Sequence, residues 1–164
     1  VITLKRFLAI LLMLVISLPS VAFGQILYTV CTPGDEVNIR EKPSLTSESV
    51  GKTRLNDSCD YTERVDGFFF APVMGIENGE GYVSASYLSI AEPVLVDNVI
   101  YITNKKSVFV RECPNGEKLL KLKKGTEVEV VMTFTDADSI DWAKTPDGYI
   151  MMKYLDEKVV EVTE

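Results

Sequence analysis

Apolar and polar side chains alternate most clearly in the stretch EVEVVMTF, residues 127–134. Its even positions are all apolar, and its odd positions include two glutamates and a threonine. Because successive side chains of a β-strand point to opposite faces, this pattern predicts a strand with one buried and one solvated face. The stretch SCDYTERV, residues 58–65, alternates in the same way. It predicts a second strand with Cys59, Tyr61 and Val65 on one side.

Turn-forming dipeptides separate short runs that are rich in Val, Ile, Tyr, Phe and Thr. Asn-Gly and Asp-Gly favour tight hairpins because both residues tolerate a positive φ angle. Beyond residue 25, no segment sustains a helical period, so we expect an all-β protein. The turn dipeptides are Asp66-Gly67, Asn78-Gly79, Asn115-Gly116 and Asp147-Gly148.

The N-terminal residues have the three-part pattern of a secretory signal peptide. Lys5 and Arg6 form a basic head, Phe7–Leu18 is an apolar run interrupted only by Ser17, and small residues follow it. About twelve apolar residues are too few for a membrane anchor, which needs roughly twenty. We expect cleavage after Gly24, with cleavage after Ala22 as the alternative, and therefore an exported protein in the periplasm or outside the cell.

The sequence also repeats itself. VNIREKPS (37–44) aligns with VFVRECPN (108–115), and GYVSASYLSI (81–90) aligns with GYIMMKYLDE (148–157). The offset between the copies falls from 71 to 67 residues along the chain, as loop insertions between matched strands would produce. Each copy is about sixty residues long, which is enough for a small domain.

These observations divide the chain into five parts. The seam between the two copies, AEPVLVDN, contains a proline and fits a short linker. The acidic tail after the second copy is a candidate for an additional edge strand. We expect a signal peptide at 1–24, a first domain at 25–90, a linker at 91–97, a second domain at 98–157 and a tail at 158–164.

The repeated motif resembles the bacterial Src-homology-3-like (SH3b) domain. The shared elements are Val-x-[Ile/Val]-Arg-x-x-Pro, a turn into a Val-rich strand, and Gly-[aromatic]-[Val/Ile]-x-x-x-Tyr-Leu. The second copy departs from the family pattern because Phe109 stands where Asn38 supplies the usual asparagine. The resemblance implies two small SH3-like β-barrels in tandem. It also implies a module that binds peptidoglycan or peptides.

In domains of this kind the ligand groove lies between two loops, here residues 42–47 and 66–69. Three consecutive aromatic residues, 68–70, adjoin it, and a strand cannot bury all three on one face. At least one must therefore be exposed or pack against the other domain. The candidate ligand-binding residues are Arg40, Lys42, Asp66, Phe68, Phe69, Tyr82, Arg111, Asp138 and Tyr149.

For some of these candidates, the sequence is also consistent with a structural role. Arg40 and Arg111 occupy matched positions, and an arginine at a strand end also donates to loop carbonyls. Tyr82 and Tyr149 either contribute to binding or close the fold. Trp142 aligns with Phe70 and is expected in the core.

The charge and the residue counts limit which partners and which catalytic or metal sites the chain supports. The formal charge of −7 becomes −9 without Lys5 and Arg6, which disfavours nucleic acid as a partner. The chain has three cysteines and no histidine, so a Cys–His nucleophile and a zinc site have no support. A disulfide between Cys31 and Cys59 remains open, and Cys113 is the expected free thiol. We expect no cofactor, no metal and no enzymatic activity.

The resulting expectation is a secreted binding protein that recognises peptidoglycan or cell-wall peptides. The alternative is an exported module for protein–protein interaction. A small hydrolase with an acidic site is the least favoured reading, because the Asp residues at 136, 138, 141 and 147 lie around predicted turns. The sequence predicts no stable membrane insertion after signal cleavage, and it leaves the oligomeric state open.

Overall fold

The computed structural model describes residues 24–72 and 80–158. Their regular structure consists of fifteen strands and two short 3₁₀ helices, so the predicted all-β class is confirmed. The predicted signal peptide and the Asn78-Gly79 turn lie outside these residues. No helix among the described residues has the length and apolar character needed to cross a membrane.

The N-terminal half, β1 to β8, forms two antiparallel sheets, in the orders β4-β1-β8 and β3-β2-β7-β6-β5. Its elements are β1 (Gln25–Thr29), β2 (Glu36–Arg40), β3 (Ser49–Arg54), β4 (Ser58–Tyr61), β5 (Glu63–Val65), β6 (Phe68–Pro72), β7 (Glu80–Ser84), η1 (Ala85–Tyr87) and β8 (Leu88–Ser89).

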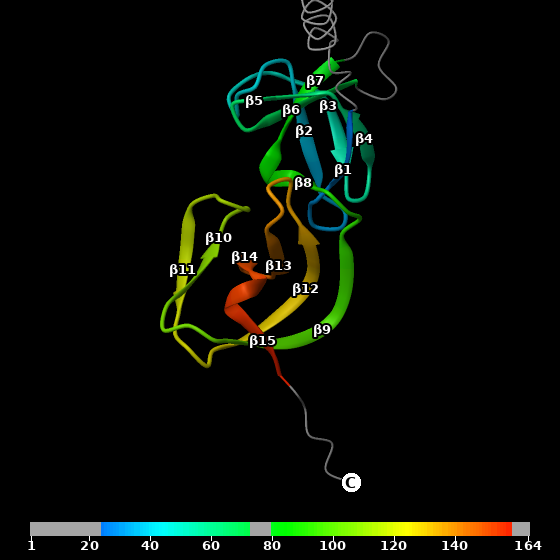
Figure 1. Ribbon diagram of the computed structural model, residues 1–164. Coiled ribbons are helices and arrows are strands. Elements are labelled where there is room, and N and C mark those ends of the chain that lie inside the picture. Colours follow the sequence, from blue (N-terminus) through cyan, green and yellow to red (C-terminus); the bar gives the residue numbers. More distant parts are fainter. Residues whose placement is uncertain (1–23, 73–79, 159–164) are drawn as a thin grey trace, which may run out of the picture.

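The C-terminal half, β9 to β15, forms one seven-stranded sheet in the order β11-β10-β14-β13-β12-β9-β15 (Figure 1). Its elements are β9 (Val94–Thr103), β10 (Val108–Arg111), β11 (Lys118–Leu122), β12 (Glu127–Thr135), β13 (Asp141–Thr145), β14 (Gly148–Met151), η2 (Met152–Tyr154) and β15 (Leu155–Glu157). Strand β9 begins at Val94, within the stretch 91–97 that the sequence predicts to be a linker.

None of the three sheets closes into a barrel, so the two predicted barrels are not seen as closed sheets. In the N-terminal half the break falls between β4 and β5. Strand β4 pairs with β1, whereas β5 pairs with β6 in the other sheet. The single strand predicted over 58–65 is therefore wrong, because the chain changes sheets at Thr62.

Alternation in β12 is as predicted. Val128, Val130, Met132 and Phe134 are buried, and the intervening residues are exposed or half-buried. Two of these side chains, Val128 and Val130, belong to a core confined to the C-terminal half. The other two pack with Val30, Trp142 and Tyr149, so this second cluster contains a residue of the N-terminal half.

The β12–β13 hairpin joins the two halves, and its tip lies beside β8 (Figure 1). The backbone N–H of Ile90 and the Oγ of Ser89 both donate to the carbonyl oxygen of Thr135, at 3.0 and 2.7 Å. The Arg64 guanidinium donates to both carboxylate oxygens of Asp138, at 2.6 and 3.1 Å. These bonds fix how the second half sits on the first.

The buried Asp136 stabilises the hairpin tip by accepting hydrogen bonds from it. Its side chain is only 3% exposed and accepts from the backbone N–H groups of Asp138 and Ile140, each at 2.9 Å. Its other oxygen accepts from the indole Nε1 of Trp142 at 2.7 Å. Trp142 itself is fully buried, which agrees with the core position expected for it.

Candidate functional site

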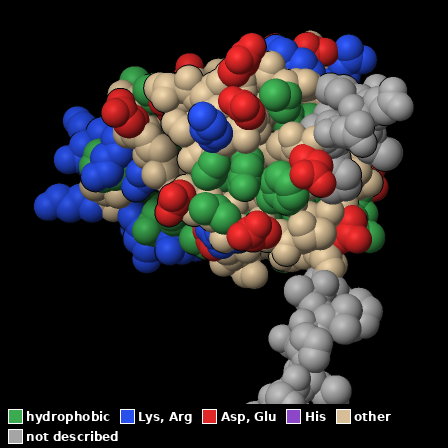
Figure 2. Space-filling view, turned by 90° about the horizontal axis from the view of Figure 1, so that it is seen from above, with side chains coloured by type: hydrophobic (Ala, Val, Ile, Leu, Met, Phe, Trp, Pro, Cys, Tyr) green, Lys and Arg blue, Asp and Glu red, His purple; other side chains and the backbone are tan. Residues whose placement is uncertain are grey.

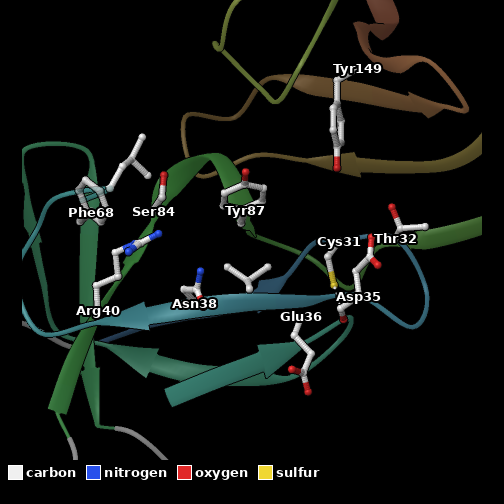
Figure 3. Close-up of a pocket in the computed structure, with 12 residues that line it drawn as sticks. Cys31, Thr32, Asp35, Glu36, Asn38, Arg40, Phe68, Ser84, Tyr87 and Tyr149 are labelled. Atoms are coloured by element: carbon white, nitrogen blue, oxygen red, sulfur yellow. Dashed lines mark hydrogen bonds between the residues drawn. The ribbon is translucent and has the colours of Figure 1, made fainter. Parts of the chain in front are cut away.

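A groove of about 350 Å³ runs along β2 of the N-terminal half and meets one side chain of the C-terminal half (Figure 3). Strand β2 supplies its floor because Val37, Asn38 and Arg40 follow one another along it. The lining residues are Cys31, Thr32, Asp35, Glu36, Val37, Asn38, Arg40, Leu45, Phe68, Ser84, Tyr87 and Tyr149.

One end of the groove is cationic. Arg40 ends β2, and its Nη1 donates to the carbonyl oxygen of Ser47 at 2.6 Å, which ties the loop between β2 and β3 to the strand. Phe68 and Ser84 lie beside it (Figure 3). The guanidinium has five donors, so one bond to the loop leaves further donors for a ligand carboxylate.

The other end is anionic. Asp35 follows a turn in which its N–H donates to the carbonyl oxygen of Thr32 at 2.9 Å, and Gly34 in this turn has a φ of 92°. The Asp35 carboxylate is exposed near Cys31 and Thr32 (Figure 3). Glu36 points away from the groove and binds Arg54 at 2.8 Å instead.

Aromatic side chains form the walls between these two ends. Tyr87 lies near the middle, and Tyr149 approaches from the C-terminal half with its hydroxyl directed toward Cys31 and Asp35 (Figure 3). Burial raises the pKa of both tyrosines above the ordinary value, so both hydroxyls are neutral at physiological pH. Tyr149 is also fixed edge-on against Phe134, with ring centroids 6.1 Å apart.

Three of the nine candidate residues meet in this groove, namely Arg40, Phe68 and Tyr149. Two more lie near it in loops: Lys42 is exposed, and Asp66 occupies a turn with a φ of 49°. The structure thus brings together part of the predicted set.

Three other candidates, namely Phe69, Tyr82 and Asp138, do not line the groove. Phe69 is buried in the core against Tyr61, and Tyr82 stacks on Phe70 with centroids 4.9 Å apart. Asp138 is held by Arg64, which lowers the pKa of its carboxyl group through a hydrogen bond and charge. Of the three consecutive phenylalanines, residue 70 is the one left half-exposed.

Arg111, the remaining candidate, belongs to a smaller hollow of about 270 Å³ on the C-terminal half. Its Nη1 donates to the carbonyl oxygen of Gly116 at 2.7 Å, as Arg40 does to its own loop. This hollow is lined by Ser107, Phe109, Arg111, Lys118, Trp142, Met151 and Tyr154.

Sequence reasoning did not select Asp35, Asn38 or Tyr87 as groove residues, and it placed the loop 42–47 beside the groove without selecting Leu45. Leu45 had a signal in the sequence, because it is an apolar residue in an otherwise polar loop, and the structure leaves it 65% exposed. Asn38 and Tyr87 belong to the motifs that carry the family resemblance, but neither was among the candidate ligand-binding residues. Asp35 had no signal beyond its place in a turn.

Burial favours the protonated form of two thiols, Cys31 in the groove and Cys113 in the C-terminal half. The Sγ of Cys31 donates to the carbonyl oxygen of Asp35 at 3.5 Å, so Cys31 is a free thiol and not half of a disulfide. Burial raises the pKa of Cys31 and of Cys113, which keeps both in the weakly nucleophilic thiol form. The described residues contain no group of three or more His, Cys, Asp or Glu side chains placed to hold a metal ion.

Comparison with known proteins identifies no family. No family model matches the chain, and no curated protein matches it. Two solved structures that it resembles are NlpC2 and NlpC1 from Trichomonas vaginalis, each with 15% sequence identity and a TM-score of 0.32. The likeness covers 88% and 90% of this chain but only 52% and 51% of those chains, so this chain spans about half their length.

This comparison corrects one expectation. Both matched structures are NlpC proteins, which form a peptidase family, and this finding contradicts the prediction that the chain is not an enzyme. A likeness at this level of identity and TM-score assigns no activity to this chain.

Proposed function

We propose that this chain is an exported protein that binds peptidoglycan or its peptide in the groove between Arg40 and Asp35. The observation that carries the proposal is the arrangement of that groove. A cationic end, an anionic end and aromatic walls are placed along one strand and closed by Tyr149 from the other half.

The charges suit a short peptide that carries both a carboxylate and an ammonium group. Peptidoglycan stem peptides have this chemistry. The free donors of Arg40 would bind the carboxylate, and the exposed carboxylate of Asp35 would bind the ammonium group. Charge-assisted hydrogen bonds of this kind fix the direction of the ligand in the groove.

The neutral walls suit the apolar part of the same ligand. Leu45 is exposed at the rim, and the half-buried ring of Tyr87 lines the groove, whereas Phe68 is 8% exposed and adds little accessible surface. Tyrosine side chains give a large contact area at low entropic cost and keep a hydroxyl group for hydrogen bonding. The groove therefore combines apolar contact with a few polar groups, which is the usual composition of a small-ligand site.

Matched features in the two halves support the resemblance to tandem SH3b domains. Arg40 pairs with Tyr82 across β2 and β7, and Arg111 pairs with Tyr149 across β10 and β14. Each arginine also donates to a carbonyl oxygen of its neighbouring loop. The anionic end has no counterpart among the residues that line the second hollow, so we assign the ligand to the N-terminal half.

The proposal is tested by sedimentation with purified insoluble peptidoglycan. We expect retention of the wild-type protein at moderate salt and a loss of about fivefold to tenfold in affinity for Asp35→Asn and for Leu45→Ala. Both side chains are exposed, so neither change should affect folding. The matched controls are Asp60→Asn and Ile26→Ala, which alter exposed side chains away from the groove.

Two outcomes would overturn the proposal. Wild-type protein that stays in the supernatant at moderate salt does not bind the wall, and the exported protein–protein interaction module then becomes the better explanation. Retention that falls equally in the groove variants and the controls would mean that binding occurs somewhere else on the surface.

A further inference from the structure

The β10–β11 region carries a positive surface on an acidic protein. Residues 105–124 contain seven basic and two acidic side chains, although the whole chain has a net charge of −7. Figure 2 shows Lys and Arg side chains gathered on the side where β10 and β11 lie in Figure 1. The exposed lysines of this surface, which we call the lysine edge, are Lys105, Lys106, Lys118, Lys121, Lys123 and Lys124.

These lysines are not neutralised within the described part of the protein. The ion pairs among the described residues use other cations, namely Lys52, Arg54, Arg64 and Lys158. Lys118 instead lies over the ring of Phe109, with its Nζ 4.4 Å from the ring centroid. The lysine edge therefore keeps its charge available for a partner outside the molecule.

Exposed leucines accompany the lysines. Leu119 is 52% exposed and Leu120 is 46% exposed, and both belong to β11 between Lys118 and Lys121. Strand β11 is the first strand of its sheet and pairs only with β10, so it lies at an edge of the molecule (Figure 1). Apolar and cationic side chains thus share one protruding strand.

Two simpler explanations account for the lysines alone. Lysines on an edge strand prevent it from pairing with strands of other molecules, and a soluble phosphate polymer would bind lysines equally well. Neither explanation requires leucines in contact with water. A membrane surface accounts for both, because apolar side chains enter the boundary between headgroups and acyl chains while lysines meet the anionic headgroups.

We propose that the lysine edge docks on the surface of a membrane that contains anionic phospholipid. The lysine ammonium groups bind headgroup phosphates, and Leu119 and Leu120 enter the headgroup–acyl boundary. Binding is peripheral and reversible. It is independent of the peptide groove, whose lining residues come from the other half of the protein except for Tyr149.

The experiment is co-sedimentation with lipid vesicles, either of phosphatidylcholine alone or with about 30% phosphatidylglycerol added. We expect binding only to the anionic vesicles and a steep decrease as salt is raised. Soluble inorganic polyphosphate serves as the competing phosphate source.

Variants separate the contributions. The triple change Lys121→Gln, Lys123→Gln and Lys124→Gln should weaken vesicle binding about 100-fold, at roughly 1 kcal/mol for each lysine. The control Lys52→Gln, Arg54→Gln and Lys158→Gln removes the same charge elsewhere and should leave binding within about twofold. The double change Leu119→Ser and Leu120→Ser should weaken binding to vesicles about tenfold and leave binding to polyphosphate unchanged.

Several results would overturn the proposal. Equal binding to neutral and anionic vesicles would remove the role of the lysines. Equal loss in the lysine-edge variant and the charge-matched control would show that net charge alone is responsible. If the leucine variant bound vesicles as tightly as the wild type, the leucines would make no contribution, and the lysine edge would be a phosphate-binding site only. Aggregation of the lysine variant with no change in vesicle binding would identify the lysines as edge protection.

Discussion

Asp136 supports the hairpin that joins the two halves, and its replacement by alanine tests that role. The change removes three hydrogen-bond acceptor contacts, two to backbone N–H groups and one to the indole of Trp142. The backbone groups lie in a hairpin tip where water can replace the carboxylate. The indole N–H belongs to a fully buried side chain and would have no other acceptor.

The cost follows from these surroundings. A hydrogen bond to a charged group contributes about 1.5–3 kcal/mol, and a buried donor without a partner costs about 1–3 kcal/mol. Because the three contacts share one carboxylate, they do not simply add, and we expect Asp136→Ala to destabilise the protein by about 3–5 kcal/mol. This is a large part of the roughly 5–15 kcal/mol that stabilises a typical domain.

Urea unfolding followed by fluorescence measures this loss directly, because Trp142 is the only tryptophan in the sequence. We expect the midpoint to fall by about 2 M with an unchanged slope. The matched control is Asp141→Ala in the same hairpin, whose exposed carboxylate accepts from Thr135 at 2.7 Å. It should cost less than about 1 kcal/mol. Equal losses of stability in the two variants would show that the buried Asp136 carboxylate contributes no more than the exposed carboxylate of Asp141.

Three further predictions concern the backbone, an ion pair and a thiol. Gly148→Ala should destabilise the protein by more than about 2 kcal/mol in urea unfolding, because its φ is 143° and a Cβ would collide with a carbonyl of β10. Gly67→Ala, in open space, should cost only about 1 kcal/mol, and an equal cost would contradict the collision. Arg64→Gln should raise the pKa of Asp138 in an NMR titration. The pair stabilises the fold above the unfolded pKa of Asp138, and this contribution disappears as pH falls through the lowered folded value. Cys31 should react with iodoacetamide far more slowly in the native protein than in urea, and rapid native alkylation at neutral pH would contradict its raised pKa.

The local sequence pattern was enough to predict the all-β class, because side-chain alternation and turn dipeptides depend on only a few neighbouring residues. The buried face of β12 follows directly from its alternating apolar positions. The change of sheet at Thr62 could not be read in the same way. On the side that carries Cys59, Tyr61 and Val65, the alternation is interrupted only by Glu63. One charged residue does not distinguish a change of sheet from a solvent-exposed strand position, and the pairing partners of β4 and β5 reveal the break.

The candidate site was harder to predict because its residues meet through contacts between distant parts of the chain. Asp138 is a charged residue in a loop, as many ligand-binding residues are. Its carboxylate instead pairs with Arg64, which is 74 positions away in the sequence. Tyr149 reaches the groove only because the β12–β13 hairpin seats the C-terminal half on β8. Strand patterns carry no information about how one half of a chain lies against the other.

The shared cluster of Val30 with Met132, Phe134, Trp142 and Tyr149 has a consequence for cooperativity. Neither half has a complete set of buried neighbours for these side chains, since separation would expose Val30 on one fragment and large aromatic residues on the other. The two halves should therefore melt in a single calorimetric transition, with equal van't Hoff and calorimetric enthalpies. Cutting the chain between residues 90 and 94 would leave two fragments that are each less stable than the corresponding part of the whole.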